Sequence, residues 1–226
     1  MKKVAIFVEG QTEQIFVKKI IERILSPGTV TVTTCQLRGG AKYPRMLILL
    51  EAQFATPQSH YYFEIYDCGN DSKVKDDIIE HLPFMKRNGF SMVIGIRDVY
   101  PNNAKIAQLR KYLTFGIPAG IPAHIVLAVN EVEAWFMAEE KHYEKINPKL
   151  TIAQVNAIAG IDVSTDSTEM IAHPAEKLQH IYNYTKRKHK VTQIVNALDY
   201  DNLYMNVRPR NESLNELLTH LDSIRE

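Results

Sequence analysis

The sequence predicts an α/β fold in which a mostly parallel sheet is flanked by helices and followed by a helical C-terminal extension. Short apolar or β-branched runs alternate with amphipathic stretches over about the first 130 residues, which is the pattern of a parallel sheet covered by helices. Beyond about residue 140, short helical segments with polar connections replace the strand-like runs. We therefore expect an α/β core over residues 1–140 and, packed on it, a helical extension over residues 141–226.

Five stretches are typical of strands. The first, "VAIFV", is apolar throughout, and the second, "TVTVTTCQL", is rich in β-branched residues, which favour strands. The third, "HYYFEIYD", has an aromatic alternation that also fits an edge strand. The expected strands are residues 4–8, 29–37, 60–67, 91–98 and 123–130.

The stretches between and after these strands predict helices. Thr12 is the expected N-cap of the first helix, and Pro83 is expected to interrupt the third. In the extension, Gly160 is a helix stop, and the basic "KRKHK" separates two further helices. The expected helices are residues 12–25, 46–55, 72–90, 104–113, 131–140 and 147–160, two within 173–198, and 211–225.

The composition argues against a membrane-spanning protein and against a strongly basic protein that binds nucleic acid through its overall charge. Lys and Arg number 27 and Asp and Glu 26, so no strong global field attracts nucleic acid or an anionic membrane, and a polyanion would have to bind a local patch. No apolar run approaches the roughly 20 residues of a membrane span, and no secretory signal is evident. With two cysteines expected to stay reduced, we expect a soluble, cytoplasmic protein without a membrane partner.

Acidic side chains follow four of the five expected strands. Glu9, Asp67 and Asp98 end the first, third and fourth strands, and Glu131 and Glu133 follow the fifth. Carboxyl ends of parallel strands meet at one edge of a sheet, and clustered carboxylates repel one another unless a cation neutralises them. An oxygen-only ligand set suits Mg²⁺ or Mn²⁺. Taken singly, each acid is more simply the polar end of a strand.

Two details of this acidic set stay open. Glu13 lies four residues after Glu9, so it fits a second metal ligand and equally an acid that stabilises the first helical turn. Glu131 and Glu133 point about 200° apart if a helix begins there, so the sequence does not determine which of them faces the site.

Two basic stretches are candidates for binding phosphate. Glycines let a backbone approach a phosphate closely, and the loop "LRGGAKYPR" adds cationic side chains, although a turn with solvated charges has the same composition. The stretch "TKRKHK" fits phosphate contact or a solvated helix face. No P-loop, GxSxG motif or zinc-ligand spacing is present. The candidates are Arg38, Gly39, Gly40, Lys42, Arg45, Lys186, Arg187 and Lys188.

The strand that runs into "FVEGQTE", together with the later Asp98 and Glu131, resembles the Toprim fold, a Rossmann-like Mg²⁺-binding module of topoisomerases, primases and OLD-family nucleases. The "EGxTE" form is similar to OLD-type and RloB-type Toprim proteins. Closer still is a bacterial family of uncharacterised Toprim-like proteins, which the chain resembles in "VEGQTEQIFV", the Gly-Gly loop, "EVEAWF" and "PAEKL". The resemblance covers most of the chain and implies a Toprim-like sheet.

The resemblance also implies roles for individual residues. Glu9 matches the Toprim glutamate, which is a general acid or base or a metal ligand, and Asp98 matches the first aspartate of the DxD metal motif. Tyr100 stands where the second aspartate belongs. The implied protein is a Mg²⁺- or Mn²⁺-dependent phosphodiester-processing enzyme, a nuclease acting on DNA or RNA in defence or repair. A partner ATPase is implied as well.

Two alternatives follow from the missing second aspartate and the balanced charge. The first is a catalytically degenerate Toprim-like module that docks on a partner ATPase or binds a nucleotide. The second is a small-molecule phosphotransfer enzyme that uses the same acidic edge. The sequence leaves the oligomeric state and the partner open.

Overall fold

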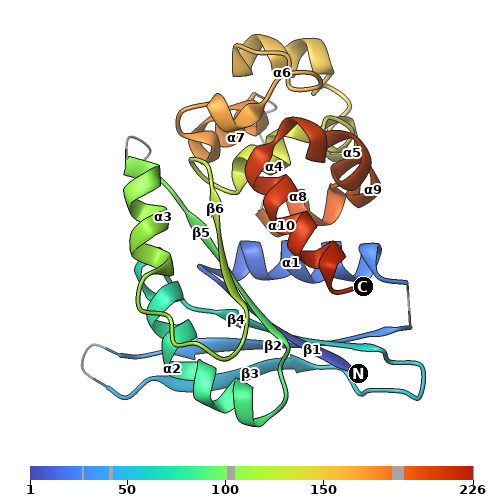
Figure 1. Ribbon diagram of the computed structural model, residues 1–226. Coiled ribbons are helices and arrows are strands. Elements are labelled where there is room, and N and C mark those ends of the chain that lie inside the picture. The colour runs from blue at the N-terminus through green and yellow to red at the C-terminus, as the bar shows by residue number, and fades with distance from the viewer. Residues whose placement is uncertain (27, 41–42, 101–104, 185–190, 226) are drawn as a thin grey trace. The chain divides into compact units, whose positions relative to one another are not determined.

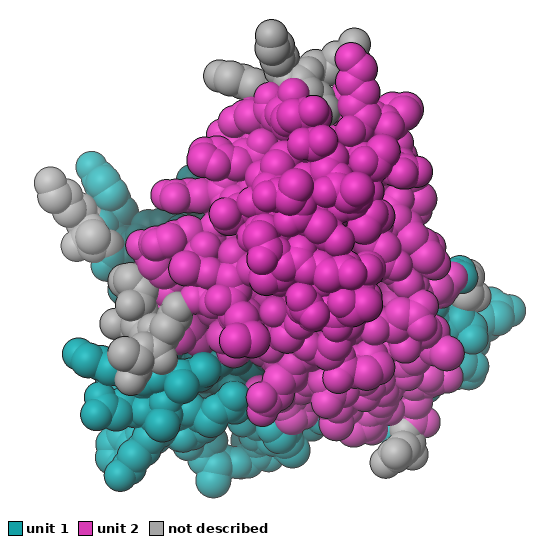
Figure 2. Space-filling model, turned by 90° about the horizontal axis from the view of Figure 1, so that it is seen from above, with its two compact units in different colours: residues 1–97, 105–127 teal, residues 98–104, 128–226 magenta. Residues whose placement is uncertain are grey.

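The computed structural model confirms the α/β class (Figure 1). It describes residues 1–26, 28–40, 43–100, 105–184 and 191–225. The chain divides into two compact units, coloured separately in Figure 2. Unit 1 comprises residues 1–97 and 105–127, and unit 2 comprises residues 98–104 and 128–226.

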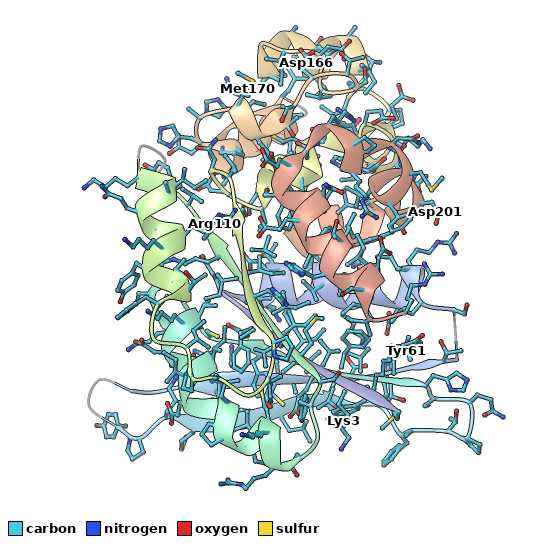
Figure 3. The ribbon with its side chains drawn as sticks, in the orientation of Figure 1. Lys3, Tyr61, Arg110, Asp166, Met170 and Asp201 are labelled. Carbon is cyan, nitrogen blue, oxygen red and sulfur yellow. The ribbon has the colours of Figure 1, made fainter. Side chains whose placement is uncertain are left out.

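The sheet is mostly parallel and has the strand order β3-β2-β4-β1-β5-β6. Strand β1 pairs in parallel with β4 and β5, β2 pairs in parallel with β4, and β3 runs antiparallel to β2. Lys3 and Tyr61, labelled in Figure 3, lie at the amino-terminal ends of β1 and β4. The strands are β1 (Lys2–Val8), β2 (Val30–Arg38), β3 (Met46–Ala52), β4 (Tyr61–Asp67), β5 (Met92–Asp98) and β6 (Ala123–Ala128).

Helices α1 and α2 lie on opposite faces of the sheet (Figure 1). The amide of Gln14 in α1 donates to the backbone carbonyls of Cys35 and Ile65, both at 2.8 Å, and so ties the helix to β2 and β4. On the α2 side, Phe7 stacks on Tyr66 with ring centroids 4.6 Å apart. The helices of unit 1 are α1 (Gln11–Ile24), the short η1 (Asp71–Lys73), α2 (Val74–Arg87) and α3 (Ile106–Thr114).

Close packing explains a glycine inside a buried strand. A Cβ at Gly95 in β5 would lie 2.9 Å from Cδ1 of Ile78 in α2 and 3.1 Å from Cγ1 of Val74. The first distance is shorter than real Cβ contacts and the second is tighter than most of them, so a side chain at position 95 would force Ile78 and Val74 to move, and glycine lets α2 pack closely on β5. The apolar fourth strand predicted from "SMVIGIRD" therefore tolerates a residue that usually weakens strands.

Unit 2 is helical, as predicted for the C-terminal part of the chain. Gly160 ends α6 in a left-handed conformation with φ 82°, which confirms the predicted stop. No helix among the described residues is long and apolar enough to cross a membrane. The elements are α4 (Glu133–Ala138), α5 (His142–Ile146), α6 (Ile152–Ala159), η3 (Thr168–Met170), α7 (Pro174–Asn183), α8 (Val191–Ala197), α9 (Tyr200–Asn202), η4 (Leu203–Val207), η5 (Arg208–Arg210) and α10 (Glu212–Ser223).

The prediction of a helix over residues 46–55 is wrong, because Met46–Ala52 forms strand β3. "MLILL" contains good helix formers, but a run without a polar face has no helical amphipathicity to define it. Antiparallel pairing with β2 satisfies its backbone, and this tertiary interaction overrides the local preference.

The structure also differs from the smaller predictions on helix capping, helix interruption and strand position. Thr12 is not the N-cap of α1, because the helix begins at Gln11 with Gly10 as its cap and without a side-chain capping bond. Pro83 does not interrupt α2, which continues through it to Arg87 with the proline exposed to solvent. The third predicted strand, β4, lies between β2 and β1, so it is not an edge strand. The predicted basic hinge "KRKHK" lies outside the described residues.

A buried carboxylate organises part of unit 2. Glu139 accepts hydrogen bonds from the backbone N–H groups of Lys141 at 3.0 Å and Asp199 at 3.1 Å, and from the side-chain amide of Asn202 at 2.8 Å. Burial opposes ionisation, but the interaction with His142 and these hydrogen bonds outweigh it and lower the pKa of Glu139. The charged group thus joins the end of α4 to α5 and α9.

A second buried carboxylate caps the last helix. Glu169 accepts hydrogen bonds from the backbone N–H groups of Glu212 and Ser213, both at 2.9 Å, and from the Ser213 hydroxyl. The first N–H groups of a helix have no partner within the helix, and an anion there also interacts favourably with the helix dipole. Ser213 in turn accepts a hydrogen bond from the indole of Trp135 at 2.9 Å.

We predict that Glu169→Ala lowers the free energy of unfolding by about 2–3 kcal/mol, because it removes a cap and leaves buried donors without an acceptor. Trp135 is the single tryptophan of the chain and is buried in unit 2, so urea unfolding followed by its fluorescence measures the effect. Glu144→Ala, at an exposed position of α5, is the matched control and should change the value by less than about 0.5 kcal/mol. Equal effects of the two substitutions would contradict the capping role.

Candidate functional site

The acidic edge of unit 1 consists of Glu9, Glu13 and Asp67. Strands β1 and β4 pair in register from Lys2 opposite Tyr61 to Val8 opposite Asp67, and the N–H of Cys68 donates to the carbonyl of Val8 at 2.9 Å. Glu9 directly follows Val8, and Glu13 lies in the first turn of α1. The two strand ends that were predicted to carry acids to one edge therefore do so, in a part of the sheet where ligands commonly bind.

Asp67 is buried and has partners on both carboxylate oxygens. Gln36 donates to Oδ2 at 2.6 Å, and the N–H of Gly69 donates to Oδ1 at 2.9 Å. The other end of the Gln36 amide accepts a hydrogen bond from Nε of Arg38 at 2.8 Å. A chain of hydrogen bonds thus runs from the exposed Arg38 at the end of β2 to the buried carboxylate at the end of β4.

The surroundings of Glu13 raise the pKa of its carboxyl group. Burial raises its pKa, hydrogen bonds from its own backbone N–H and that of Gly10 oppose this, and the charge of Asp67 raises the pKa further. A Cβ at position 10 would lie 3.3 Å from Oε2 of Glu13, so a larger residue there would crowd the carboxylate. The glycine after Glu9 therefore leaves room for the second acid.

The Gly-Gly loop is held in place by Arg45. Its guanidinium pairs with both carboxylate oxygens of Asp77 in α2 and donates to the carbonyls of Gly39 at 3.1 Å and Cys68 at 2.7 Å. The hydrogen bond with Asp77 raises the pKa of Arg45, so the cation stays charged. Since Asp77 neutralises that charge, Arg45 supports the loop structurally.

The two glycines of this loop have left-handed backbones, with φ of 95° for Gly39 and 109° for Gly40. A Cβ at Gly39 would lie 2.5 Å from the carbonyl oxygen of Pro44, so the turn itself requires glycine. Arg38, Gly39 and Gly40 are the predicted phosphate ligands of this loop that are both described and exposed, and Arg38 is the cationic one among them. Lys42 lies outside the described residues, as do Lys186, Arg187 and Lys188.

In unit 2, Asp98 and Glu131 both act as hydrogen-bond acceptors for backbone groups. Oδ1 of Asp98 accepts from the N–H of Val132 at 3.1 Å, and Oε2 of Glu131 accepts from the N–H of Ala175 at 2.9 Å. Asp98 thus joins the end of β5 to the segment before α4, and Glu131 joins that segment to the start of α7. Their convergence at one metal site stays a prediction. Glu131 also caps the start of α7, while the half-buried Glu133 begins α4.

Sequence reasoning gave no role to Asn130 and interpreted His173 as structural. Among the described residues they are the non-glycine positions with a positive φ, 64° and 54°, and such strained backbone concentrates at functional sites. The carbonyl of Asn130 accepts from the N–H of Tyr100 at 2.9 Å, and the Tyr100 and His173 rings lie 4.8 Å apart between centroids. Tyr100, in place of the second aspartate, thus packs against the residue before Pro174.

No group of three or more His, Cys, Asp or Glu side chains within the described ranges is placed to hold a metal ion. Glu9, Glu13 and Asp67 belong to unit 1, and Asp98, Glu131 and Glu133 belong to unit 2. Each set contains carboxylates that already accept hydrogen bonds from the protein. The metal-binding roles of these six residues stay predictions.

The basic "RPR" stretch of unit 2 is also engaged within the chain. Arg208 donates to Asp222 and Asn215 at 2.6 and 2.7 Å. Arg210 donates to the carbonyls of Ala138 and Val163 at 2.6 and 2.5 Å. Both arginines therefore hold helices of unit 2 together, although they also line a cavity of about 490 Å³ with Met170.

We predict that Glu13→Gln stabilises the protein at neutral pH and has little effect in acid. A carboxyl group with a raised pKa contributes stability that is fully present below its unfolded-state pKa and is lost as the pH rises through its folded-state pKa. Urea unfolding of the wild type and of Glu13→Gln at several pH values from acid to neutral measures the difference in their free energy of unfolding, which should grow with pH. A difference that is independent of pH would show that the charge of Glu13 does not destabilise the folded protein.

Comparison with known proteins identifies the family. Searches of curated proteins and of solved structures gave no match. A family model described as "Domain of unknown function (DUF4276)" matches residues 8–222, which is nearly the whole chain. The Toprim resemblance of the motifs stays a prediction. The matched range includes the acidic edge of unit 1 from Glu9 onward as well as Asp98, Glu131 and His173, and the chain belongs to the DUF4276 family.

Proposed function

We propose that this protein is a Mg²⁺- or Mn²⁺-dependent phosphodiester-processing enzyme, a nuclease that acts on DNA or RNA in defence or repair. The observation that carries the proposal is the acidic edge of unit 1, where in-register pairing of β1 and β4 gathers Glu9, Glu13 and Asp67. The raised pKa of Glu13 supports it, because burial and the charge of Asp67 disfavour a second anion. A divalent cation would remove that penalty.

The donor set fits a weakly held, hard cation. Mg²⁺ binds proteins through one or two carboxylates and completes its octahedron with waters and substrate phosphates. Glu9 and Glu13 would supply the carboxylates here, and the charge of Asp67, which Gln36 and Gly69 hold in place, would add to the attraction for the cation. A bound cation would polarise the phosphate and lower the pKa of a water molecule.

Two residues of the chain would take part in binding: Arg38 would bind the phosphate, and Glu13 would exchange its proton for the cation. Arg38 is exposed beside Gln36, so its free N–H groups can bind a phosphate oxygen near the acidic edge. Glu13 retains its proton to a higher pH than an ordinary glutamate, and it would give up this proton when its carboxylate binds the cation. The roles of Asp98, Glu131 and Glu133 as further ligands stay predictions.

A second candidate function is supported by the hydrogen bonds of these same acids. Both oxygens of Asp67, one of Asp98 and one of Glu131 accept hydrogen bonds from the chain, and Tyr100 replaces the second aspartate of the expected motif. Carboxylates used in this way have fewer lone pairs for a metal. We therefore keep the alternative of a catalytically inactive module that binds a nucleotide or docks on a partner ATPase.

We predict that the protein binds Mn²⁺ in calorimetric titration and that Glu9→Gln and Glu13→Gln each weaken binding at least about tenfold. Binding should release protons at any pH at which Glu13 is protonated in the free protein, visible as an enthalpy that depends on the buffer, because Glu13 must ionise to bind. Glu80→Gln replaces an exposed acid of α2 and should leave the affinity unchanged. Mn²⁺-dependent cleavage of plasmid or single-stranded DNA or RNA should be lost in Glu9→Gln.

The outcomes separate the two candidates. Metal binding with cleavage supports the nuclease, whereas metal binding without cleavage of any of these substrates favours the binding module. If neither Mn²⁺ nor Mg²⁺ binds, the metal-dependent enzyme is excluded, whatever the variants do.

We also predict that Arg38→Ala weakens binding of a fluorescently labelled oligonucleotide and reduces the slope of log affinity against log salt by about one. Arg87→Ala removes an exposed cation at the end of α2 and is the matched control. Anisotropy titrations at several salt concentrations measure both slopes. If Arg38→Ala and Arg87→Ala behave alike, Arg38 has no specific role in seating phosphate.

A further inference from the structure

Unit 1 contains a pocket of about 370 Å³ at the amino-terminal ends of β1, β2 and β4, on the face of the sheet that α2 covers. Pockets for small molecules commonly have about 300–1,000 Å³, so this one suits a small ligand. The pocket and the acidic edge lie at opposite ends of the same strand pair, because Lys2 pairs with Tyr61 at one end and Val8 with Asp67 at the other. A ligand here therefore does not contact the acidic edge.

The register of the strands places two opposite charges in this pocket. Lys3 of β1 pairs with Tyr62 of β4, and Glu64, two residues further along β4, pairs with the short Ala5. Side chains two residues apart share one face of a sheet, and Lys3, Tyr62 and Glu64 all line the pocket. At about 3.3 Å per residue and about 4.8 Å between strands, the Cα atoms of Lys3 and Glu64 are about 8 Å apart. One small molecule can therefore contact both charged groups.

Within the described part of the chain, Lys3 and Glu64 form no ion pair, either with each other or with another side chain. Nζ of Lys3 donates to the carbonyl of Asn88 at 3.0 Å, which leaves two of its three N–H groups for a ligand. Glu64 accepts a hydrogen bond from the thiol of Cys35 at 3.9 Å. Burial and the charge of Glu64 raise the pKa of Cys35 to about 12, so the thiol stays neutral and does not compensate the carboxylate.

Aromatic rings supply the apolar part of the pocket. Phe84 of α2 is 45% exposed, whereas Phe90 is 7% exposed and packs edge-on against Tyr62 with ring centroids 6.2 Å apart. All three rings line the pocket. Covering an exposed ring with an apolar group is favourable, and the faces of aromatic rings also attract a cationic group. The pocket thus combines an apolar surface with one positive and one negative group.

We propose that this pocket binds a free α-amino acid with a large apolar or aromatic side chain. The ammonium group of the ligand binds Glu64, its carboxylate binds Lys3, and its side chain packs on Phe84. Charge complementarity requires a zwitterion, because a purely anionic ligand is repelled by Glu64 and a purely cationic one by Lys3. This binding needs neither a metal ion nor the proposed enzymatic activity, so it is tested separately from them.

Isothermal titration calorimetry of the full chain with three probes that share a phenyl group tests the charge requirement. Near neutral pH, L-phenylalanine is a zwitterion, phenethylamine is a cation and 3-phenylpropionate is an anion. L-Phenylalanine should bind with a Kd of about 1 mM or below, as good ligands of this size do. The other two probes should bind at least about tenfold more weakly, because each lacks one charge-assisted hydrogen bond.

Two substitutions that largely keep the size of the side chain assign the contacts. Glu64→Gln should weaken binding of L-phenylalanine at least about tenfold and abolish the preference for it over 3-phenylpropionate. Lys3→Met should abolish the preference for L-phenylalanine over phenethylamine. Glu80→Gln and Lys2→Met change exposed charges outside the pocket and, as matched controls, should bind like the wild type. Circular dichroism would verify that all four variants are folded.

The other outcomes overturn the proposal. If L-phenylalanine, L-leucine and L-methionine all fail to bind at about 10 mM, tenfold above the expected Kd, the pocket is not an amino-acid site. Equal affinity of the wild type for L-phenylalanine and phenethylamine would exclude the contact with Lys3, and a preference for 3-phenylpropionate would exclude the contact with Glu64. Binding that Glu64→Gln leaves unchanged would place the ligand elsewhere on the protein.

Discussion

The in-register parallel pairing of β1 with β4 is the constraint on which the rest of unit 1 depends. It places the end of β1 beside Asp67, and Gln14 fixes α1 over β2 and β4 through two backbone carbonyls. A slip by one residue would reverse the faces of every side chain in β1. It would expose Phe7, which stacks on Tyr66, and move Glu9 away from the other acids. Core packing and the geometry of the acidic edge are therefore set by the same register.

In both units, buried carboxylates accept hydrogen bonds from backbone N–H groups. The two units differ in what these carboxylates do. In unit 2, Glu139 and Glu169 each accept three or more hydrogen bonds and join helices. In unit 1, burial and, to a smaller extent, the charge of Asp67 raise the pKa of Glu13. A group whose ionisation is penalised in the folded state is more typical of a site than of a scaffold. This contrast, more than the number of acids, distinguishes the edge of unit 1.

The sequence was informative where the signal was local. Apolar runs that end in an acid located β1, β4 and β5, and the glycine stop of α6 was visible directly. Residues 46–52 could not be assigned, because an apolar run without periodicity becomes a strand only through its pairing with β2. The interactions of Arg45 with Asp77 and of Tyr100 with His173 connect distant segments. Such contacts leave no spacing that a single sequence reveals.

The anchoring of the Gly-Gly loop has a thermodynamic consequence for any anion that binds beside it. Arg45 ties this loop both to α2 through Asp77 and to the chain after β4 through Cys68. The backbone at Gly39 and at Cys68, whose carbonyls Arg45 binds, thus loses much of its conformational entropy when the protein folds, before any ligand arrives. A preorganised loop loses less freedom on binding. Affinity at this edge would then be governed by desolvation of Arg38 and its new contacts, with little cost for ordering the backbone.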